Sequence, residues 1–137
     1  MKLFIFSGKE QNVIPGQAGK NDVVLGHEIS EATDFFYDSV EAYDFLEVHP
    51  EENCLQILLS KVTAGGKLLL QGTEIYRATE MLDKGKLGTN DFSMIVTGGR
   101  VRCNSVHEIV NELQQSGFEV KFAGITNHYY TIEARRK

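Results

Sequence analysis

Glu47 and His49 are candidate proton acceptors of this chain. They stand between residues 39–45, whose weak apolar–polar alternation is typical of a strand, and Pro50, which is typical of a helix start. Carboxylate and imidazole groups are the side chains that most often serve as general bases. A His beside a helix start is also typical of a structural or solvent-exposed residue. We take Glu47 and His49 as the candidate catalytic residues, and the structural interpretation of His49 stays open.

A second set of candidates follows segments that have the pattern of strands. These residues are Ser7, Gly8, Glu28, Tyr43 and Asp44. Ligands of open α/β sheets bind beyond the carboxyl ends of the strands, so residues placed there could hydrogen-bond a ligand. The alternatives are a tight turn for Ser7 and Gly8 and a solvated loop carboxylate for Glu28.

Other chemistries have weaker support in the sequence. Residues 16–21 (GQAGKN) match a phosphate-binding loop only in part, because Ile14 occupies its first glycine position and Asn21 replaces Ser or Thr. Cys54 and Cys103 are far apart and lack the spacing of zinc ligands, so we expect reduced thiols and no metal site. Arg100 and Arg102 could contact an anionic substrate, although solvated surface is the default for an arginine.

Three short segments in the first third of the chain have the composition of β-strands. Residues 2–6 form a continuous apolar run, residues 22–25 are β-branched, and residues 39–45 alternate weakly between apolar and polar. Residues 12–21 contain Pro and Gly and indicate a loop, whereas residues 30–37 are compatible with a short helix or a turn. The candidate residues would thus lie at one edge of a sheet.

Three later segments have the periodicity of amphipathic helices. They run from Pro50 to the glycines at 65 and 66, over residues 74–84, and from the capping box of Ser105 and Glu108 to residues 116–117. The apolar residues 67–71, between the first two helices, indicate a strand that is buried on both faces, as in a parallel sheet covered by helices.

The last two strand-like runs, residues 118–125 and 129–135, are separated by three residues. So short a link permits an antiparallel hairpin but no parallel crossover. The whole pattern predicts a single α/β domain over residues 1–137. We expect a three-layer sandwich whose mostly parallel sheet ends in an antiparallel β-hairpin.

The composition narrows the classes of function. The chain has 137 residues, 42% of them hydrophobic, which is ordinary for one soluble domain. A net charge of −5 argues against a general nucleic-acid binder. No run of about 18 apolar residues is present to span a membrane. The first apolar run lacks a signal-peptide cleavage site, which favours a buried strand and a cytoplasmic protein.

Four short segments follow one another in an order that is also found in a known protein family. They are residues 44–47 (DFLE), 63–70 (TAGGKLLL), 116–120 (SGFEV) and 130–135 (YTIEAR). In this order the chain resembles the Rossmann-like S-adenosylmethionine-dependent methyltransferase family over roughly residues 38–137. That family often has a strand ending in Asp-x-Leu-Glu-His, a Lys-Pro-Gly-Gly turn into its fifth strand, and a reversed final strand.

The resemblance implies a cofactor and a place for it. The cofactor would be S-adenosylmethionine, with Ser7 and Gly8 at its amino-acid portion. Glu28 or Asp44 would accept hydrogen bonds from its ribose or its adenine amino group, with Tyr43 beside them. The chain departs from the family here, because a single glycine follows the first strand in place of a Gly-x-Gly-x-Gly loop.

The resemblance also implies a reaction, methyl transfer to a small molecule or a glycan precursor. Glu47 or His49 would take a proton from an oxygen or nitrogen acceptor. His49 stands one position later than the family's His, which Val48 replaces. The alternative, favoured by the single-glycine loop, is a catalytically inactive binding or assembly module of the same fold. A homodimer is a further expectation, because a shortened sheet exposes an edge or an apolar face.

Overall fold

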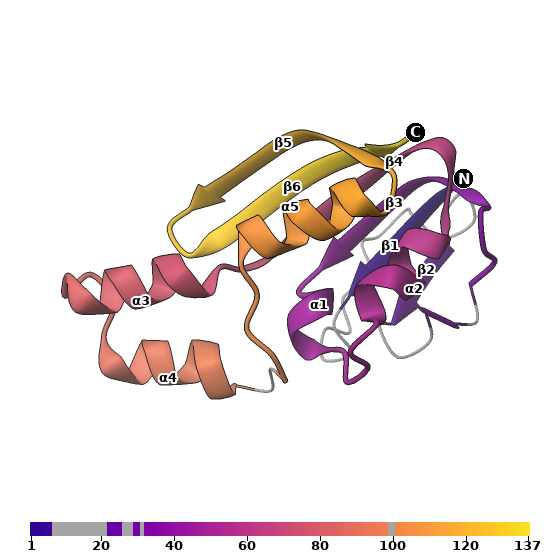
Figure 1. Cartoon of the computed structure of the whole chain (residues 1–137). Coiled ribbons are helices and arrows are strands. Elements are labelled where there is room, and N and C mark those ends of the chain that lie inside the picture. The colour runs from indigo at the N-terminus through magenta and orange to yellow at the C-terminus, as the bar shows by residue number, and fades with distance from the viewer. Residues whose placement is uncertain (7–21, 26–28, 31, 99–100) are drawn as a thin grey trace.

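The computed structural model describes residues 1–6, 22–25, 29–30, 32–98 and 101–137 (Figure 1). The strands are β1 (Lys2–Phe6), β2 (Asp22–Leu25), β3 (Tyr37–Tyr43), β4 (Val62–Thr73), β5 (Phe118–Thr126) and β6 (Tyr129–Arg136). The helices are α1 (Phe45–Val48), α2 (Cys54–Ser60), α3 (Ile75–Asp83), α4 (Thr89–Thr97) and α5 (Val106–Gln115).

The described strands form one sheet in the order β2-β1-β3-β4-β6-β5. The first four strands in this order are parallel, β6 runs antiparallel to β4, and β5 runs antiparallel to β6. Asn127 and His128 link β5 to β6, and Asn127 takes a positive φ of 55°, which Asn tolerates better than most residues. The protein is therefore an α/β fold with a mixed sheet.

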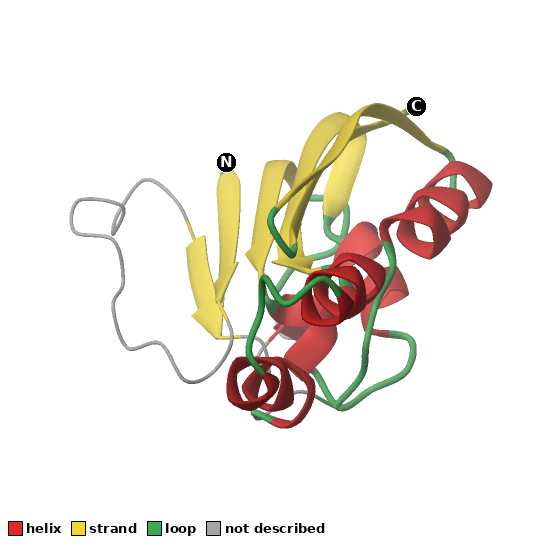
Figure 2. Ribbon diagram, turned by 90° about the vertical axis from the view of Figure 1, so that its left-hand side faces the viewer, coloured by secondary structure: helices red, strands yellow, loops and turns green. Residues whose placement is uncertain are grey.

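Three helices cover one face of the sheet. Side chains alternate along a strand, so residues two apart point to the same face. On this face the strands contribute Leu3, Ile5, Val40, Ala42, Leu68, Leu70, Ile132 and Ala134, all buried. They pack against apolar side chains of α1, α2 and α5, which lie on one side of the sheet in Figure 2. This is the hydrophobic core.

The opposite face of β3, β4 and β6 carries different side chains, and we call it the open face. It presents Ser39, Glu41, Lys67, Leu69, Glu133 and Arg135, all half-buried or exposed. Among the described residues no helix lies on the open face (Figure 2). The described part of the chain thus forms two layers, and the third layer remains a prediction.

Two strands differ from their expected bounds. β3 ends at Tyr43, because Asp44 adopts left-handed backbone angles of φ 51° and ψ 25° and turns the chain into α1. β4 starts at Val62, five residues before the expected strand, because Val62 pairs with Tyr37 before a register shift brings Ser39 opposite Lys67. The glycines that were expected to end a helix thus lie inside a bulged strand.

The helices also differ in part from the prediction. α2 begins at Cys54 and not at Pro50, since His49 has extended backbone angles of φ −68° and ψ 129°, the conformation that a following Pro favours. α5 begins as expected, because the Ser105 side chain accepts a hydrogen bond from the Glu108 N–H at 3.2 Å. The pattern did not predict α1 or α4.

The paired helices α3 and α4 lie beyond the end of β4, away from the rest of the sheet (Figure 1). The carboxylate of Glu74 caps α3 by accepting hydrogen bonds from the N–H groups of Tyr76 and Arg77. α3 buries only Ala78, and α4 buries no residue. None of the helices in the described ranges has the length and apolar character that crossing a membrane requires.

Candidate functional site

An open pocket of about 220 Å³ lies at the carboxyl ends of β3 and β4. Its lining comes from β3, β4, β6 and the residue that follows β3, namely Tyr43, Asp44, Gln71, Gly72, Tyr129, Tyr130 and Thr131. This is the edge where α/β proteins bind their ligands. Tyr43 and Asp44, two of the residues singled out from sequence, therefore do meet at one pocket.

The backbone holds Asp44 at the rim of this pocket. Its N–H donates a 2.9 Å hydrogen bond to the Gln71 carbonyl of the neighbouring strand. Its left-handed conformation is one that Asp adopts more readily than most residues. Beside it, the Tyr43 hydroxyl donates to the Glu41 carboxylate at 2.7 Å. Burial, and then this hydrogen bond, raise the pKa of Tyr43, so the phenol stays protonated.

Glu47 lies on the helix side of the sheet, in α1, with only 1% of its surface exposed. Neither of its carboxyl oxygens has a hydrogen-bond partner among the described residues. Burial raises its pKa from 4.5 to about 7, and the negative charge of Asp44 adds to the rise. The Tyr130 hydroxyl and the Asn104 side chain partly offset the rise by facing the carboxyl group without good hydrogen-bond geometry. Glu47 therefore titrates near neutral pH.

Gly72 makes room for this carboxyl group. A Cβ atom at position 72 would lie 2.2 Å from Glu47 Oε1 and 2.6 Å from the Tyr130 hydroxyl oxygen. Both distances are far below van der Waals contact, so any side chain at position 72 would displace Glu47 or Tyr130. Tyr130 is itself buried, and its pKa is raised by burial and by the adjacent Glu47. The three residues form one tightly packed group.

Other buried polar atoms gather around Glu47. Thr73 Oγ1 and Asn104 Nδ2 also have no hydrogen-bond partner among the described residues. A cavity of about 10 Å³ adjoins them, lined by Glu47, Thr73, Ile75, Ile95, Arg102 and Cys103. A space of this size holds about one water molecule. Unsatisfied buried polar groups are rare in folded proteins, and a cluster of them near a pocket makes this a candidate functional site.

His49 has a different environment from Glu47. Its ring is buried and packs on the Phe45 ring, with 5.0 Å between the ring centroids. Its Nδ1 accepts a hydrogen bond from the N–H of Glu51 at 3.2 Å, and burial lowers the pKa of the imidazole. His49 lines neither of the two cavities described above. Of the two predicted bases, the geometry favours Glu47.

Arg102 has a structural position that the sequence did not reveal. Its guanidinium donates hydrogen bonds to the carbonyls of Leu46 and Glu51, at 2.9 and 2.8 Å, and to the Cys54 sulfur at 2.9 Å. Its neighbour Val101 donates from its N–H to the Glu47 carbonyl at 2.7 Å. Arg102 thus ties the segment before α5 to α1 and α2, and it is not a solvated surface residue.

The remaining predicted residues, Ser7, Gly8, Glu28 and Arg100, lie outside the described residues. Gly72, Tyr130 and Asn104 were not predicted, because only the pairing of β4 with β6 and the segment before α5 bring them to Glu47. Within the described ranges, no group of three or more His, Cys, Asp or Glu side chains could hold a metal ion.

Comparison with solved structures gives the relatives of this fold. An S-adenosylmethionine-dependent methyltransferase from Mesorhizobium loti matches with a TM-score of 0.65 and 10% identity, over 98% of this chain and 90% of the other. Another from Aquifex aeolicus matches with a TM-score of 0.62 and 12% identity, over 100% and 82%.

A third match is the N,N-8-amino-8-demethyl-D-riboflavin dimethyltransferase from Streptomyces davawensis, with a TM-score of 0.58 and 13% identity, over 99% of this chain and 50% of the other. No protein-family model and no curated protein matches the sequence. At such low identity, the structural matches establish a shared fold.

Proposed function

We propose that this chain, which has the fold of S-adenosylmethionine-dependent methyltransferases, binds that cofactor and transfers its methyl group to a small molecule. The observation that carries the proposal is the coincidence of two features at one edge of the sheet. A ligand-sized pocket lies at the carboxyl ends of β3 and β4, and a buried carboxyl group with a pKa of about 7 lies directly behind it. The riboflavin-derivative dimethyltransferase of the same fold supports a small-molecule acceptor.

The residues at the pocket suit the polar parts of the cofactor. The Asp44 carboxylate and the Gln71 amide can accept hydrogen bonds from ribose hydroxyls or from the adenine amino group. The Tyr43 and Tyr129 rings offer flat apolar surface beside them. We propose Tyr43 and Asp44 as cofactor-binding residues, together with Ser7, Gly8 and Glu28 as the sequence implies. Bound there, the cofactor supplies an electrophilic methyl group.

The part of Glu47 in this reaction is that of a general base. An oxygen or nitrogen acceptor must lose a proton as its bond to carbon forms, and a group with a pKa near the working pH serves this purpose best. Glu47 meets the condition because burial brings its pKa to about 7. His49 remains a proposed second base.

We also propose that the protein is located in the cytoplasm. Cys54 and Cys103 are both free thiols, the state that a reducing cytoplasm maintains.

The first experiment is calorimetric titration of the full chain with S-adenosylmethionine and with S-adenosylhomocysteine. Binding should also raise the melting temperature, because a ligand at 100 times its dissociation constant stabilises the folded state by about 2.7 kcal/mol. Asp44→Asn should weaken binding by about tenfold through loss of one charge-assisted hydrogen bond, while Asn tolerates the left-handed backbone at this position.

Asp83→Asn, at the exposed end of α3, is the matched control and should bind as the native protein does. Absence of heat and of thermal shift at millimolar ligand would contradict the enzyme and leave the alternative, a binding or assembly module. Binding that Asp44→Asn leaves unchanged would place the cofactor elsewhere.

A further inference from the structure

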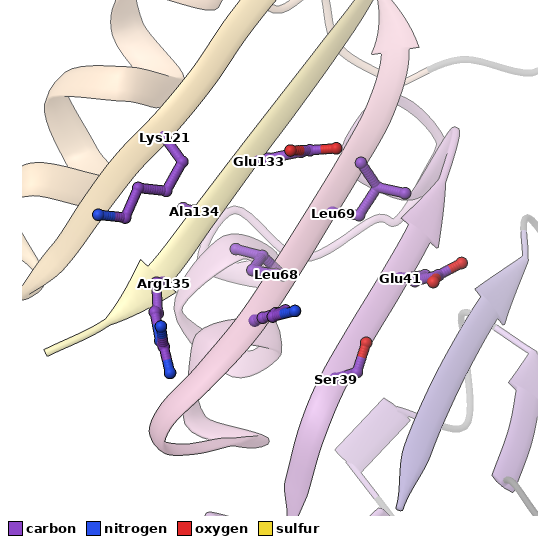
Figure 3. A pocket seen from close by; sticks show the side chains of 9 residues that line it. Ser39, Glu41, Leu68, Leu69, Lys121, Glu133, Ala134 and Arg135 are labelled. Atoms are coloured by element: carbon purple, nitrogen blue, oxygen red, sulfur yellow. The ribbon is translucent and has the colours of Figure 1, made fainter.

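The open face of the sheet is hollowed along its length. One cavity of about 320 Å³ is lined by residues of β3, β4, β5 and β6, including Glu41, Leu69 and Glu133. A second of about 670 Å³ adjoins it toward the N-terminus and shares Ser39, Glu41, Lys67 and Arg135 with the first. Figure 3 shows Leu69 between Glu133 on one neighbouring strand and Glu41 on the other.

The strand register sorts the charged side chains of this face into two adjacent rows. Lys67 lies opposite Arg135 on β6 and Ser39 on β3, and these three residues form the basic row. Leu69, two residues further along β4, lies opposite Glu133 on β6 and Glu41 on β3, and these three form the acidic row. Each row thus crosses the same three strands.

The basic row is unfavourable in an isolated sheet. Lys67 and Arg135 are directly opposite each other on antiparallel strands, and like charges in that position repel. Arg135 is also held in place, because its Nε donates to the Gly65 carbonyl at 2.9 Å. Lys121 of β5, which forms an ion pair with Glu119, adds a third cation at the rim of the same cavity. The face therefore carries charges in an arrangement that a partner of suitable pattern would stabilise.

The sheet topology favours a cover on the open face. Four of the six strands are parallel, and parallel sheets are found almost only with both faces covered. On the open face no described helix provides that cover. Both charge signs are present, so a partner carrying one sign would meet repulsion from one of the two rows.

We propose that the open face binds the open face of a second copy of this chain. A two-fold axis that runs across the strands, between the two rows, brings the basic row of each copy over the acidic row of the other. Arg135 of each copy then faces Glu133 of the other, and the aliphatic stem of Lys67 covers Leu69. The pattern is self-complementary, which is the condition for a closed dimer.

The test is analytical ultracentrifugation of the full chain from low micromolar to several hundred micromolar. We expect a monomer–dimer equilibrium whose dissociation constant increases with salt, because charge pairs contribute to it. Leu69→Lys, at the centre of the face, should weaken the dimer at least tenfold. Glu52→Lys, on the exposed surface before α2, is the matched control and should leave the equilibrium unchanged.

A charge exchange makes the test specific. Glu133→Arg alone and Arg135→Glu alone should each weaken the dimer about tenfold, and the double variant should restore it, because the pairs between copies re-form with reversed signs. A chain that stays monomeric at every concentration overturns the proposal. So does a dimer that Leu69→Lys does not affect, since it would use another surface. Neither result bears on cofactor binding, which calorimetry measures separately.

Discussion

The carboxyl group of Glu47 is held in an environment that lowers the stability of the folded protein. It is withdrawn from water, and neither of its oxygens has a hydrogen-bond partner among the described residues. An isolated buried carboxyl avoids the cost of a buried charge by staying protonated, which is why its pKa rises to about 7. A group of this kind persists at functional sites more often than in purely structural cores.

Replacing Glu47 should change how stability depends on pH. The folded-state pKa of about 7 is above the ordinary 4.5, so between these values the folded state binds more protons than the unfolded state. The contribution of Glu47 to the free energy of unfolding therefore falls as pH rises through this window, by about 3 kcal/mol. Glu47→Gln removes it. Urea unfolding at pH 4.5 and pH 8 measures this. On going to pH 8, the free energy of unfolding of the variant should increase by about that amount relative to that of the native protein.

Glu52→Gln is the control for this measurement, because Glu52 is exposed. Its stability difference from the native protein should be the same at both pH values. A constant difference for Glu47→Gln as well would mean that Glu47 titrates as an ordinary surface carboxyl, and the proposed base would lose its support.

Gly72 is the second residue whose replacement is informative. A methyl group there would overlap Glu47 Oε1 and the Tyr130 hydroxyl, so Gly72→Ala should lower the free energy of unfolding by about 2 kcal/mol through overpacking. Gly88→Ala is the control, since its Cβ would meet only Asp91 Oδ2 at 3.9 Å. In the double variant Gly72→Ala/Glu47→Ala the overlap with Glu47 is relieved and only that with Tyr130 stays, so urea unfolding should give less than the sum of the single effects. Strict additivity would contradict the contact.

At the scale of elements, α1 and the start of α2 depend on a residue that lies far away in sequence. The Arg102 guanidinium satisfies two carbonyl groups there and contacts the Cys54 sulfur. Arg102→Met leaves these carbonyls without their donor, and we expect it to lower the free energy of unfolding by about 3 kcal/mol. Arg102→Lys should recover little of this, because an ammonium group lacks the fork geometry.

Chemical denaturation measures both Arg102 variants. Arg77→Met is the control, because Arg77 is exposed and forms only a surface ion pair with Glu80, which contributes about 0.5 kcal/mol or less. If Arg102→Met lowered the free energy of unfolding by no more than Arg77→Met does, the hydrogen bonds of Arg102 would not hold these elements together.

Elements with strong local signals could be predicted from the sequence, and those without them could not. The capping residues and apolar stripe of α5 are local, as is the short link between β5 and β6. α1 has four residues and α4 buries none, so neither leaves an apolar periodicity in the sequence. Glu47 could be proposed from its place after a strand, but its neighbours Gly72 and Tyr130 reach it only through the pairing of β4 with β6.

The helix α4 should be the least protected of the longer helices. It buries no residue, whereas α5 buries Ile109 and Leu113 against the sheet. Local opening of a helix without buried contacts requires little free energy. Hydrogen exchange followed by mass spectrometry should therefore show residues 89–97 exchanging at least tenfold faster than residues 106–115. Equal protection of the two segments would indicate that α4 is packed against a surface.

At the scale of the whole molecule, the sheet has two unlike faces. The covered face holds the apolar core against α1, α2 and α5, and the pocket and Glu47 lie at the carboxyl edge. The open face is charged in two rows and lies along the strands. Tyr43, Gln71 and Thr131, which line the pocket, form the next row of the open face beyond the acidic row, so a second copy on this face would lie close to the pocket rim.

If two copies pair through the open face, heat stability must depend on protein concentration. Association stabilises the folded state by mass action, so the melting temperature of the native chain should rise by a few degrees between about 5 and 500 μM. Leu69→Lys removes the pairing and should melt at one temperature across this range, below the native chain only at high concentration. Differential scanning calorimetry distinguishes these cases. A native melting temperature that does not change with concentration would mean that the chain stays monomeric and would contradict the pairing. The repulsion between Lys67 and Arg135 would then have no compensation from a second copy.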